Sequence, residues 1–206
     1  VGFVFLESRP DAEDVTQRSG LALRYGYGRG HAHHDNLNID LFAHDTSVTP
    51  ELGYPCWAHP LGDTAHTIHH NTVMVDGKAQ YSGAISHGAL EAFAAAPEAS
   101  YAEVSSSPSA YGCSTYRRAV CLADAPGGNV YLLDIFRVSG GTVRTFCAHG
   151  PACESMDSNL QVGGPAGAYP VSNAGRGLQP NVLDTRTAQT DGDVWADWKH
   201  KTETTN

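Results

Sequence analysis

Apolar and polar residues alternate along the chain in many short runs, a pattern typical of β-strands that bury one face. The run Leu37–Ala43 shows it clearly, because every second residue from Leu37 to Leu41 is apolar. Segments rich in glycine, proline and asparagine separate the runs, as expected for turns. The predicted strands are Val1–Glu7, Gly20–Tyr27, Leu37–Ala43, Thr72–Val75, Ser100–Ser105, Thr115–Leu122, Asn129–Val138, Thr142–Ala148 and Asp193–Lys199.

The number and spacing of these runs predict an all-β fold, a large antiparallel β-sandwich. Ala125–Gly128 is predicted to close a hairpin between two strong strand runs, and Ser139–Gly141 to do the same for the next pair. The alanine-rich segment Gly88–Ala96, which Pro97 stops, is the one predicted helix. Gly163–Gly177 is rich in glycine, proline and serine and is predicted to be a long surface loop.

The composition is that of a folded domain, with 206 residues, 41% hydrophobic and 17% charged. A sandwich of this length is ordinary as a single unit. The formal net charge of -9 argues against a general nucleic-acid-binding protein, which normally carries a basic face. No apolar run approaches the roughly 20 residues that cross a bilayer. Arginines could still form a local basic cluster or lie dispersed in solvent: Arg24, Arg29, Arg117, Arg118, Arg137 and Arg144.

The five cysteines include no Cys-x-x-Cys pair, so thiolate metal binding is not expected. In an oxidising compartment, Cys113 could pair with Cys121, or Cys147 with Cys153. The apolar start of the chain, Val1–Ser8, lacks the basic leader of a signal peptide, and the chain has no initiator methionine. We therefore expect a processed or partial chain.

Most of the eleven histidines are concentrated between Gly30 and Asp76. His31 and His33 are two residues apart, so on an extended backbone their side chains point to the same side and His34 points to the other. Neutral imidazole is a good zinc ligand, and a carboxylate can complete the ligand set. Histidines bonded within the protein or exposed to solvent are the alternative interpretation. His44, His59 and His66 are expected to be exposed loop residues.

Several motifs, in their order along the chain, resemble the C-terminal sandwich of the heparinase II/III-like polysaccharide lyases. Most of the specific motifs lie in the first 80 or so residues, and the weaker ones extend the resemblance over most of the chain. The matching segments are Leu21–Gly26, Gly30–Leu37, Glu51–Tyr54 and His70–Gly77, with weaker matches at Tyr116–Arg118 and in Val130–Gly140 as far as His149.

The resemblance implies an architecture and an activity. Members of the family have a helical (α/α) toroid followed by an antiparallel β-sandwich, with the active site in the cleft between them. Residues 1–206 would then be the sandwich alone, without the toroid. The family cleaves uronate-containing acidic polysaccharides, such as heparan sulfate or alginate, by β-elimination. Such substrates imply a periplasmic or secreted protein.

The resemblance also implies a site. In the family, the second histidine of His-x-His, an acidic residue and the histidine before Asn-Thr hold a zinc ion; here these are His33, Glu51 and His70. The acidic residue is usually Asp, so Glu51 departs from the family pattern. His31, the first motif histidine, would face the substrate and donate to the uronate carboxylate or assist the base. Tyr54 would be a second catalytic residue on the sandwich side.

Two other functions fit parts of the pattern. A non-catalytic carbohydrate-binding sandwich would keep the metal only for stability. A zinc hydrolase would use His33 and His70 to activate water, and would give saturated products instead of the ultraviolet-absorbing unsaturated products of a lyase. Trp57, Trp195 and Trp198 could stack on sugar rings or serve only in packing.

Overall fold

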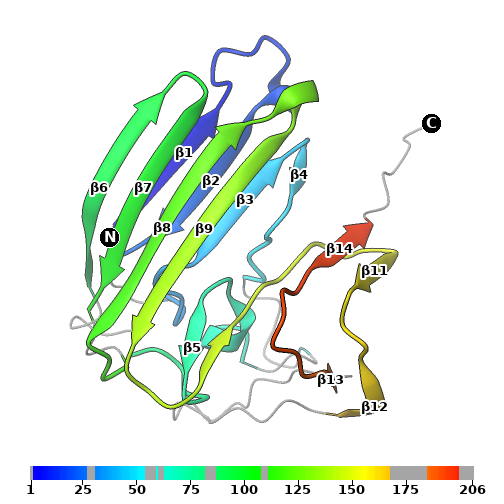
Figure 1. Cartoon of the computed structure of the whole chain (residues 1–206). Helices are drawn as coiled ribbons and strands as arrows, with labels where there is room; N and C mark the ends of the chain where they lie inside the picture. Colours follow the sequence, from blue (N-terminus) through cyan, green and yellow to red (C-terminus); the bar gives the residue numbers. More distant parts are fainter. Residues whose placement is uncertain are drawn as a thin grey trace.

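Most of the predicted strands join two four-stranded antiparallel sheets, which lie one behind the other in Figure 1. This computed structural model describes residues 2–26, 31–53, 59, 63–81, 87–107, 111–167 and 185–199. The first sheet has the order β1 (Phe3–Ser8), β2 (Ser19–Arg24), β3 (Ile39–Ala43), β4 (Thr46–Ser47). The second has the order β6 (Gly88–Ala96), β7 (Ala99–Ser106), β8 (Thr115–Asp124), β9 (Val130–Ser139).

Three two-stranded ladders lie beside the main sheets. They pair β5 (Val73–Val75) with β10 (Arg144–Phe146), β11 (Ser155–Ser158) with β14 (Ala196–Lys199), and β12 (Gly163–Gly167) with β13 (Thr185–Thr187). Helical structure in the described residues is limited to short 3-10 turns at Val15–Gln17, Thr67–His69 and Pro126–Gly128. None of these turns has the length and apolar character needed to cross a membrane.

The two main sheets bury their facing apolar residues in one core. On β1, Leu6 is buried, whereas its neighbour Phe5 is exposed on the outer face. Leu23 of β2 and Leu122 of β8 are fully buried and belong to the same cluster. Each such leucine contributes about 1.5–3 kcal/mol by leaving water. The antiparallel β-sandwich that the alternation predicts is therefore confirmed.

The predicted helix at Gly88–Ala96 is wrong, because this segment is the edge strand β6. It pairs along its length with β7, and Pro97 lies in the tight turn between them. The alanine-rich composition favours a helix locally, but the backbone hydrogen bonds to β7 override that preference. Most of β6 is solvent-exposed, and a register shift between Leu90 and Ala92 interrupts its pairing.

One of the two predicted hairpins forms. Gly127 and Gly128 have positive φ, and the turn that contains them joins β8 to β9 as predicted. The second prediction is wrong, because β10 pairs with β5 and not with β9. At Gly141 the φ angle is +69°, and a Cβ there would lie 2.3 Å from a methyl group of Val75. Glycine at this position therefore lets the chain cross closely over β5.

Two further expectations about loops and cysteines are corrected. The predicted loop at Gly163–Gly177 begins with a strand, β12, and its residues 168–177 lie outside the described residues. Neither candidate disulfide forms, because Cys113 is buried in the main core and Cys147 in a smaller cluster, away from their expected partners. The four described cysteines are free: Cys113, Cys121, Cys147 and Cys153.

The described arginines do not gather into one basic cluster, because the carboxylates that they contact are dispersed. Arg144 instead donates to backbone carbonyls of the turn at Gly140, and Arg29 lies outside the described residues. The ion pairs of these arginines are Arg24 with Asp35, Arg118 with Asp134, Arg117 with Glu91, and both Arg117 and Arg137 with Glu103.

Arg118 is the largest fully buried side chain and lies between the sheets. Its Nε and Nη2 donate to the two oxygens of Asp134 at 2.8 and 2.6 Å. Its Nη1 donates to the carbonyl oxygens of Leu37 and Asn71, both at 2.5 Å. Arg118 of the second sheet therefore fixes two connecting segments, one before β3 and one before β5.

We predict that Arg118→Ala lowers the free energy of unfolding by about 3–5 kcal/mol, because it leaves Asp134 and two carbonyl groups without their donor. Urea denaturation measures the change. Arg137→Ala is the matched control: its side chain is 55% exposed, so removing its ion pair should cost less than about 1 kcal/mol. A loss in Arg118→Ala no larger than that in the control would contradict the prediction.

Candidate metal centre

The histidine-rich segment 31–38 connects β2 to β3 without regular structure. The N–H of Leu37 donates to the carbonyl of Arg24 at 2.8 Å, and the N–H of Asn36 donates to the side chain of Gln80 at 2.6 Å. Leu37 itself has a positive φ of 61° and is fully buried. The segment is thus held by backbone hydrogen bonds even though it belongs to no sheet.

His34 takes part in this anchoring. Its N–H donates to the carbonyl of Ala65 at 2.9 Å, and its own carbonyl accepts from the hydroxyl of Thr67 at 2.7 Å. Its ring nitrogen Nδ1 contacts the carbonyl oxygen of Gln80. His33 lines the cavity described below, and His34 is not among its lining residues. The two adjacent histidines therefore have different surroundings.

The second histidine group forms a buried 3-10 turn before β5. The side chain of His66 accepts from the N–H of Ile68 at 3.2 Å and so caps the turn. His70 comes directly after the last residue of this turn. His66 is only 1% exposed, so the expectation of an exposed loop residue is wrong. His44 is exposed, as expected, and His59 is half-buried.

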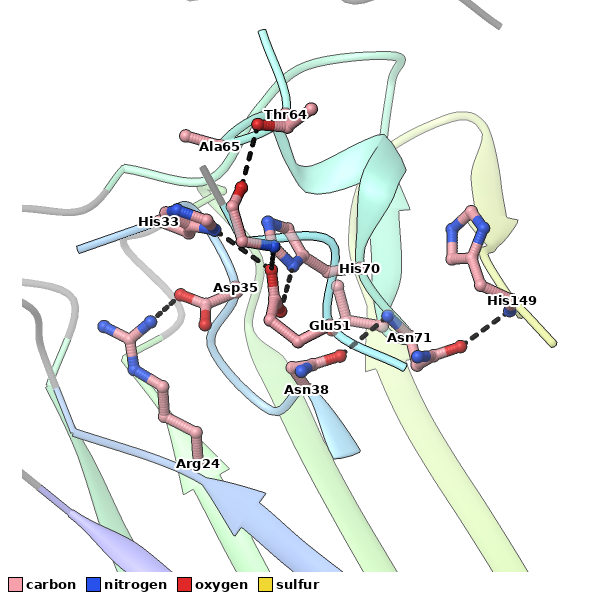
Figure 2. A network of polar contacts seen from close by, with 12 residues as sticks. Arg24, His33, Asp35, Asn38, Glu51, Thr64, Ala65, His70, Asn71 and His149 are labelled. Carbon is pink, nitrogen blue, oxygen red and sulfur yellow. Dashed lines mark hydrogen bonds and ion pairs between the residues drawn. The ribbon is translucent and has the colours of Figure 1, made fainter. Parts of the chain in front are cut away.

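The rings of His33 and His70 both point to the carboxylate of Glu51 (Figure 2). Nδ1 of His33 lies 3.2 Å from Oε1, and Nδ1 of His70 lies 2.9 Å from Oε2. The two ring centroids are 5.1 Å apart. One possible ligand atom from each of these residues lies within 4.8 Å of the other two. The structure therefore brings together the three residues predicted as metal ligands.

Glu51 is held in place by its own loop. The N–H of Gly53 donates to Oε1 of Glu51 at 3.2 Å, and the hydroxyl of Thr64 donates to the carbonyl of Gly53 at 3.0 Å. Burial raises the pKa of Glu51, but the hydrogen bonds from His33 and His70 outweigh it and leave the pKa well below its usual value. The carboxylate is therefore ionised and available as a ligand at neutral pH.

These three side chains suit zinc. Two imidazole nitrogens and a carboxylate oxygen are donors that zinc accepts, whereas calcium and magnesium prefer oxygen alone. Zinc bonds of about 2.0–2.2 Å place neighbouring ligands of a tetrahedron roughly 3.4 Å apart. The two distances from Glu51 to the histidines, 3.2 and 2.9 Å, are close to that spacing.

The three residues adjoin a cavity of about 450 Å³ on the outer face of the first sheet. His33 and Glu51 line the cavity, and His31 lines it as an exposed residue. The predicted catalytic histidine thus shares a cavity with two of the predicted metal ligands. Tyr54, the other predicted catalytic residue, lies outside the described residues.

Two acidic residues of this cavity are missing from the sequence prediction. Asp35 forms a buried ion pair with Arg24 and so ties the histidine-rich segment to β2 (Figure 2). Asp40 lies on β3 and lines the cavity near Glu51. The alternation of the run Leu37–Ala43 places Asp40 on the polar face of its strand, so a signal for it exists in the sequence.

Asn71, the residue after His70, is held by hydrogen bonds to Asn38 and His149. The N–H of Asn71 donates to the side chain of Asn38 at 2.7 Å, and the side chain of Asn71 accepts from the N–H of His149 at 2.6 Å. The ring of His149 donates to the carbonyl of Ile68 at 2.9 Å. His149, which the sequence leaves unassigned, therefore has a structural contact with the turn that carries His70.

Solved structures similar to this chain share its fold. A heparinase III gene product aligns with a TM-score of 0.57 and 14% identity, over 96% of this chain and 35% of its own. A structure of that product with methylated lysines gives 0.53 and 13%, over 95% and 33%. The HepC heparan sulfate lyase mutant from Pedobacter heparinus gives 0.50 and 14%, over 87% and 32%. This chain thus spans about a third of the length of each.

No curated protein matches the chain significantly. The family model described as heparinase II/III-like, C-terminal, matches residues 2–196. That match covers nearly the whole chain, including the segments that carry His33, Glu51 and His70. The chain therefore belongs to the heparinase II/III-like C-terminal family.

Proposed function

We propose that residues 1–206 are the sandwich domain of a polysaccharide lyase that cleaves uronate-containing acidic polysaccharide by β-elimination. His33, Glu51 and His70 would hold a zinc ion in this domain. The observation that carries the proposal is their convergence beside the cavity that His31 also lines, in a chain of a polysaccharide lyase family. Similar solved structures are described as heparinase III and heparan sulfate lyase, which supports the substrate class.

The proposal includes a larger protein. Each similar solved chain is about three times as long as the part that this chain covers. We propose that a helical toroid precedes the sandwich and completes the substrate cleft. The proposed substrate, an acidic polysaccharide of the kind that the family cleaves, implies a periplasmic or secreted location. The chain by itself would bind metal and would not turn over substrate at the rate of the whole enzyme.

In this proposal the metal has a supporting role. When bound, zinc supplies a double positive charge that links three segments of the chain. His33 lies between β2 and β3, Glu51 follows β4, and His70 precedes β5. Because the three segments are far apart in the sequence, their joint ligation would fix one wall of the cavity. The wall also carries His31, so metal binding would hold the backbone at His31 in position to meet the substrate.

The proposed reaction requires a hydrogen-bond donor or a base, and His31 is the proposed residue. Elimination removes the proton α to the uronate carboxylate, and negative charge develops on that carboxylate as the proton leaves. A group on the cavity wall must donate to the carboxylate or accept the proton. His31 is exposed on the wall and can do either. Tyr54 stays the proposed second catalytic group.

The first prediction concerns metal content. The purified chain should contain about one zinc per molecule, the stoichiometry of a single site. His33→Ala and His70→Ala should each lose the metal, because they leave only two ligands. Elemental analysis of the variants measures this, with circular dichroism to confirm that each variant is folded.

His44→Asn is the control for the zinc measurement. Residue 44 is exposed and has a positive φ of 52°, a conformation that asparagine tolerates. It should keep the metal. A well-folded wild-type chain that contains no zinc after growth and dialysis with the metal would contradict the proposed ligand set.

The second prediction concerns activity and uses the longer protein that contains this domain. His31→Ala should lower kcat by about a hundredfold or more, the usual contribution of a general acid or base. Its zinc content should stay at the wild-type level, because His31 is not a proposed ligand. Unsaturated uronate products, followed by their ultraviolet absorbance, measure the rate.

The same assay separates the lyase from the two other functions. Saturated products and loss of activity on chelation would identify a zinc hydrolase. Binding of the polysaccharide without any product would identify a binding domain. His44→Asn again serves as the control and should retain wild-type kcat.

A further inference from the structure

Asp40 is an acidic residue of the cavity with no role in the proposed ligand set. It lies on β3 opposite Ala22 of β2, and its side chain points to the outer face of the first sheet, where the cavity lies. Its Oδ1 is buried and has no hydrogen-bond partner in the described part of the chain. Asp40 also lies outside the group of residues whose atoms converge within ligand distance.

The charges that line the cavity do not balance. Asp35, Asp40 and Glu51 contribute three carboxylates, and among the described lining residues Arg24 is the one arginine or lysine. The guanidinium of Arg24 is in direct contact with Asp35, so its charge is already compensated. Glu51 contacts the rings of His33 and His70, whereas Asp40 keeps a buried oxygen without a hydrogen-bond partner in the described part of the chain. The charge of Glu51 disfavours the ionised form of Asp40, and a cation beside Glu51 would favour it.

The protonation behaviour of Asp40 agrees with this imbalance. Burial and the charge of Glu51 raise the pKa of Asp40 and the charge of His70 lowers it, which together bring this pKa to about 6. A carboxylate with a buried, unpaired oxygen is costly to keep ionised. A divalent cation held by Glu51 and the two histidines would place positive charge on the side of Asp40 that now faces negative charge.

We propose that Asp40 is an outer partner of the metal: it does not ligate the ion, but its negative charge strengthens binding of zinc to His33, Glu51 and His70. This inference rests on the proposed zinc site. It has two consequences of opposite sign. With zinc bound, the charge of Asp40 stabilises the ion; without zinc, the same charge repels Glu51 and destabilises the folded chain.

The variant Asp40→Asn tests both consequences, because the amide keeps the size of the side chain and removes its charge. Its zinc affinity, measured by competition with a chromophoric chelator, should fall about tenfold or more, as for other groups that support metal ligands. Its melting temperature in excess chelator should equal or exceed that of the metal-free wild type. Excess zinc should raise the melting temperature of the variant, relative to its metal-free form, by less than it raises that of wild type.

Asp11→Asn is the matched control. Asp11 is exposed and follows β1 at the end of the sheet away from Phe3 and the cavity, so its loss changes net charge equally without changing the cavity. It should keep wild-type zinc affinity and melting temperatures. An equal fall in affinity in both variants would mean that net charge alone acts, and would overturn the inference.

Further results would also overturn or support the proposed role of Asp40. Wild-type zinc affinity in Asp40→Asn would overturn the role of Asp40 while leaving the proposed ligands intact. A lower melting temperature of the metal-free variant would show that Asp40 serves packing, and would overturn the inference too. If wild type itself binds no zinc, the proposed site fails together with this inference, and that measurement comes first. Weaker binding with undiminished metal-free stability supports it.

Discussion

The buried guanidinium of Arg118 is the interaction on which the arrangement of the candidate site depends. Its ion pair with Asp134 fixes it inside the sandwich. From there it donates to the carbonyl of Leu37, four residues after His33, and to the carbonyl of Asn71, directly after His70. One side chain of the second sheet thus holds both histidine segments. The imidazoles are positioned by the fold, so a metal would bind to a site that is already assembled.

That assembly concentrates negative charge. The fold places Glu51 between two imidazoles and Asp40 beside the same cavity, while Arg24 is occupied by Asp35. The N–H of Gly53 and the rings of His33 and His70 position Glu51, but Oδ1 of Asp40 has no hydrogen-bond partner in the described part of the chain. A cation in the cavity would compensate this negative charge. This physical need connects the shape of the site to its proposed metal, and it explains how a domain can be folded and still gain stability from an ion.

Alternation in the sequence predicts most of the sandwich, because a strand that buries one face must repeat every second residue. Leu37–Ala43 illustrates this, since its apolar positions enter the core and its polar positions face the cavity. The Gly88–Ala96 segment shows the limit: its composition favours a helix, and only pairing with β7 makes it a strand. The ligand set follows from motifs, and the structure brings its members together. Arg118 and Asp134 could not be predicted, because no local pattern indicates which buried carboxylate an arginine will meet.

Glu51 shows how a glutamate can replace the expected aspartate at a proposed ligand position and still offer a carboxylate there. The extra methylene of Glu51, relative to the aspartate that the family pattern leads one to expect, moves the carboxylate farther from the backbone. The loop accommodates it through Gly53, which has a positive φ of 61° and donates its N–H to the same carboxylate. Each oxygen then meets a different imidazole. A longer side chain folded back on its own loop can therefore present its oxygens where a shorter one would, which is how three ligand positions can converge on one ion.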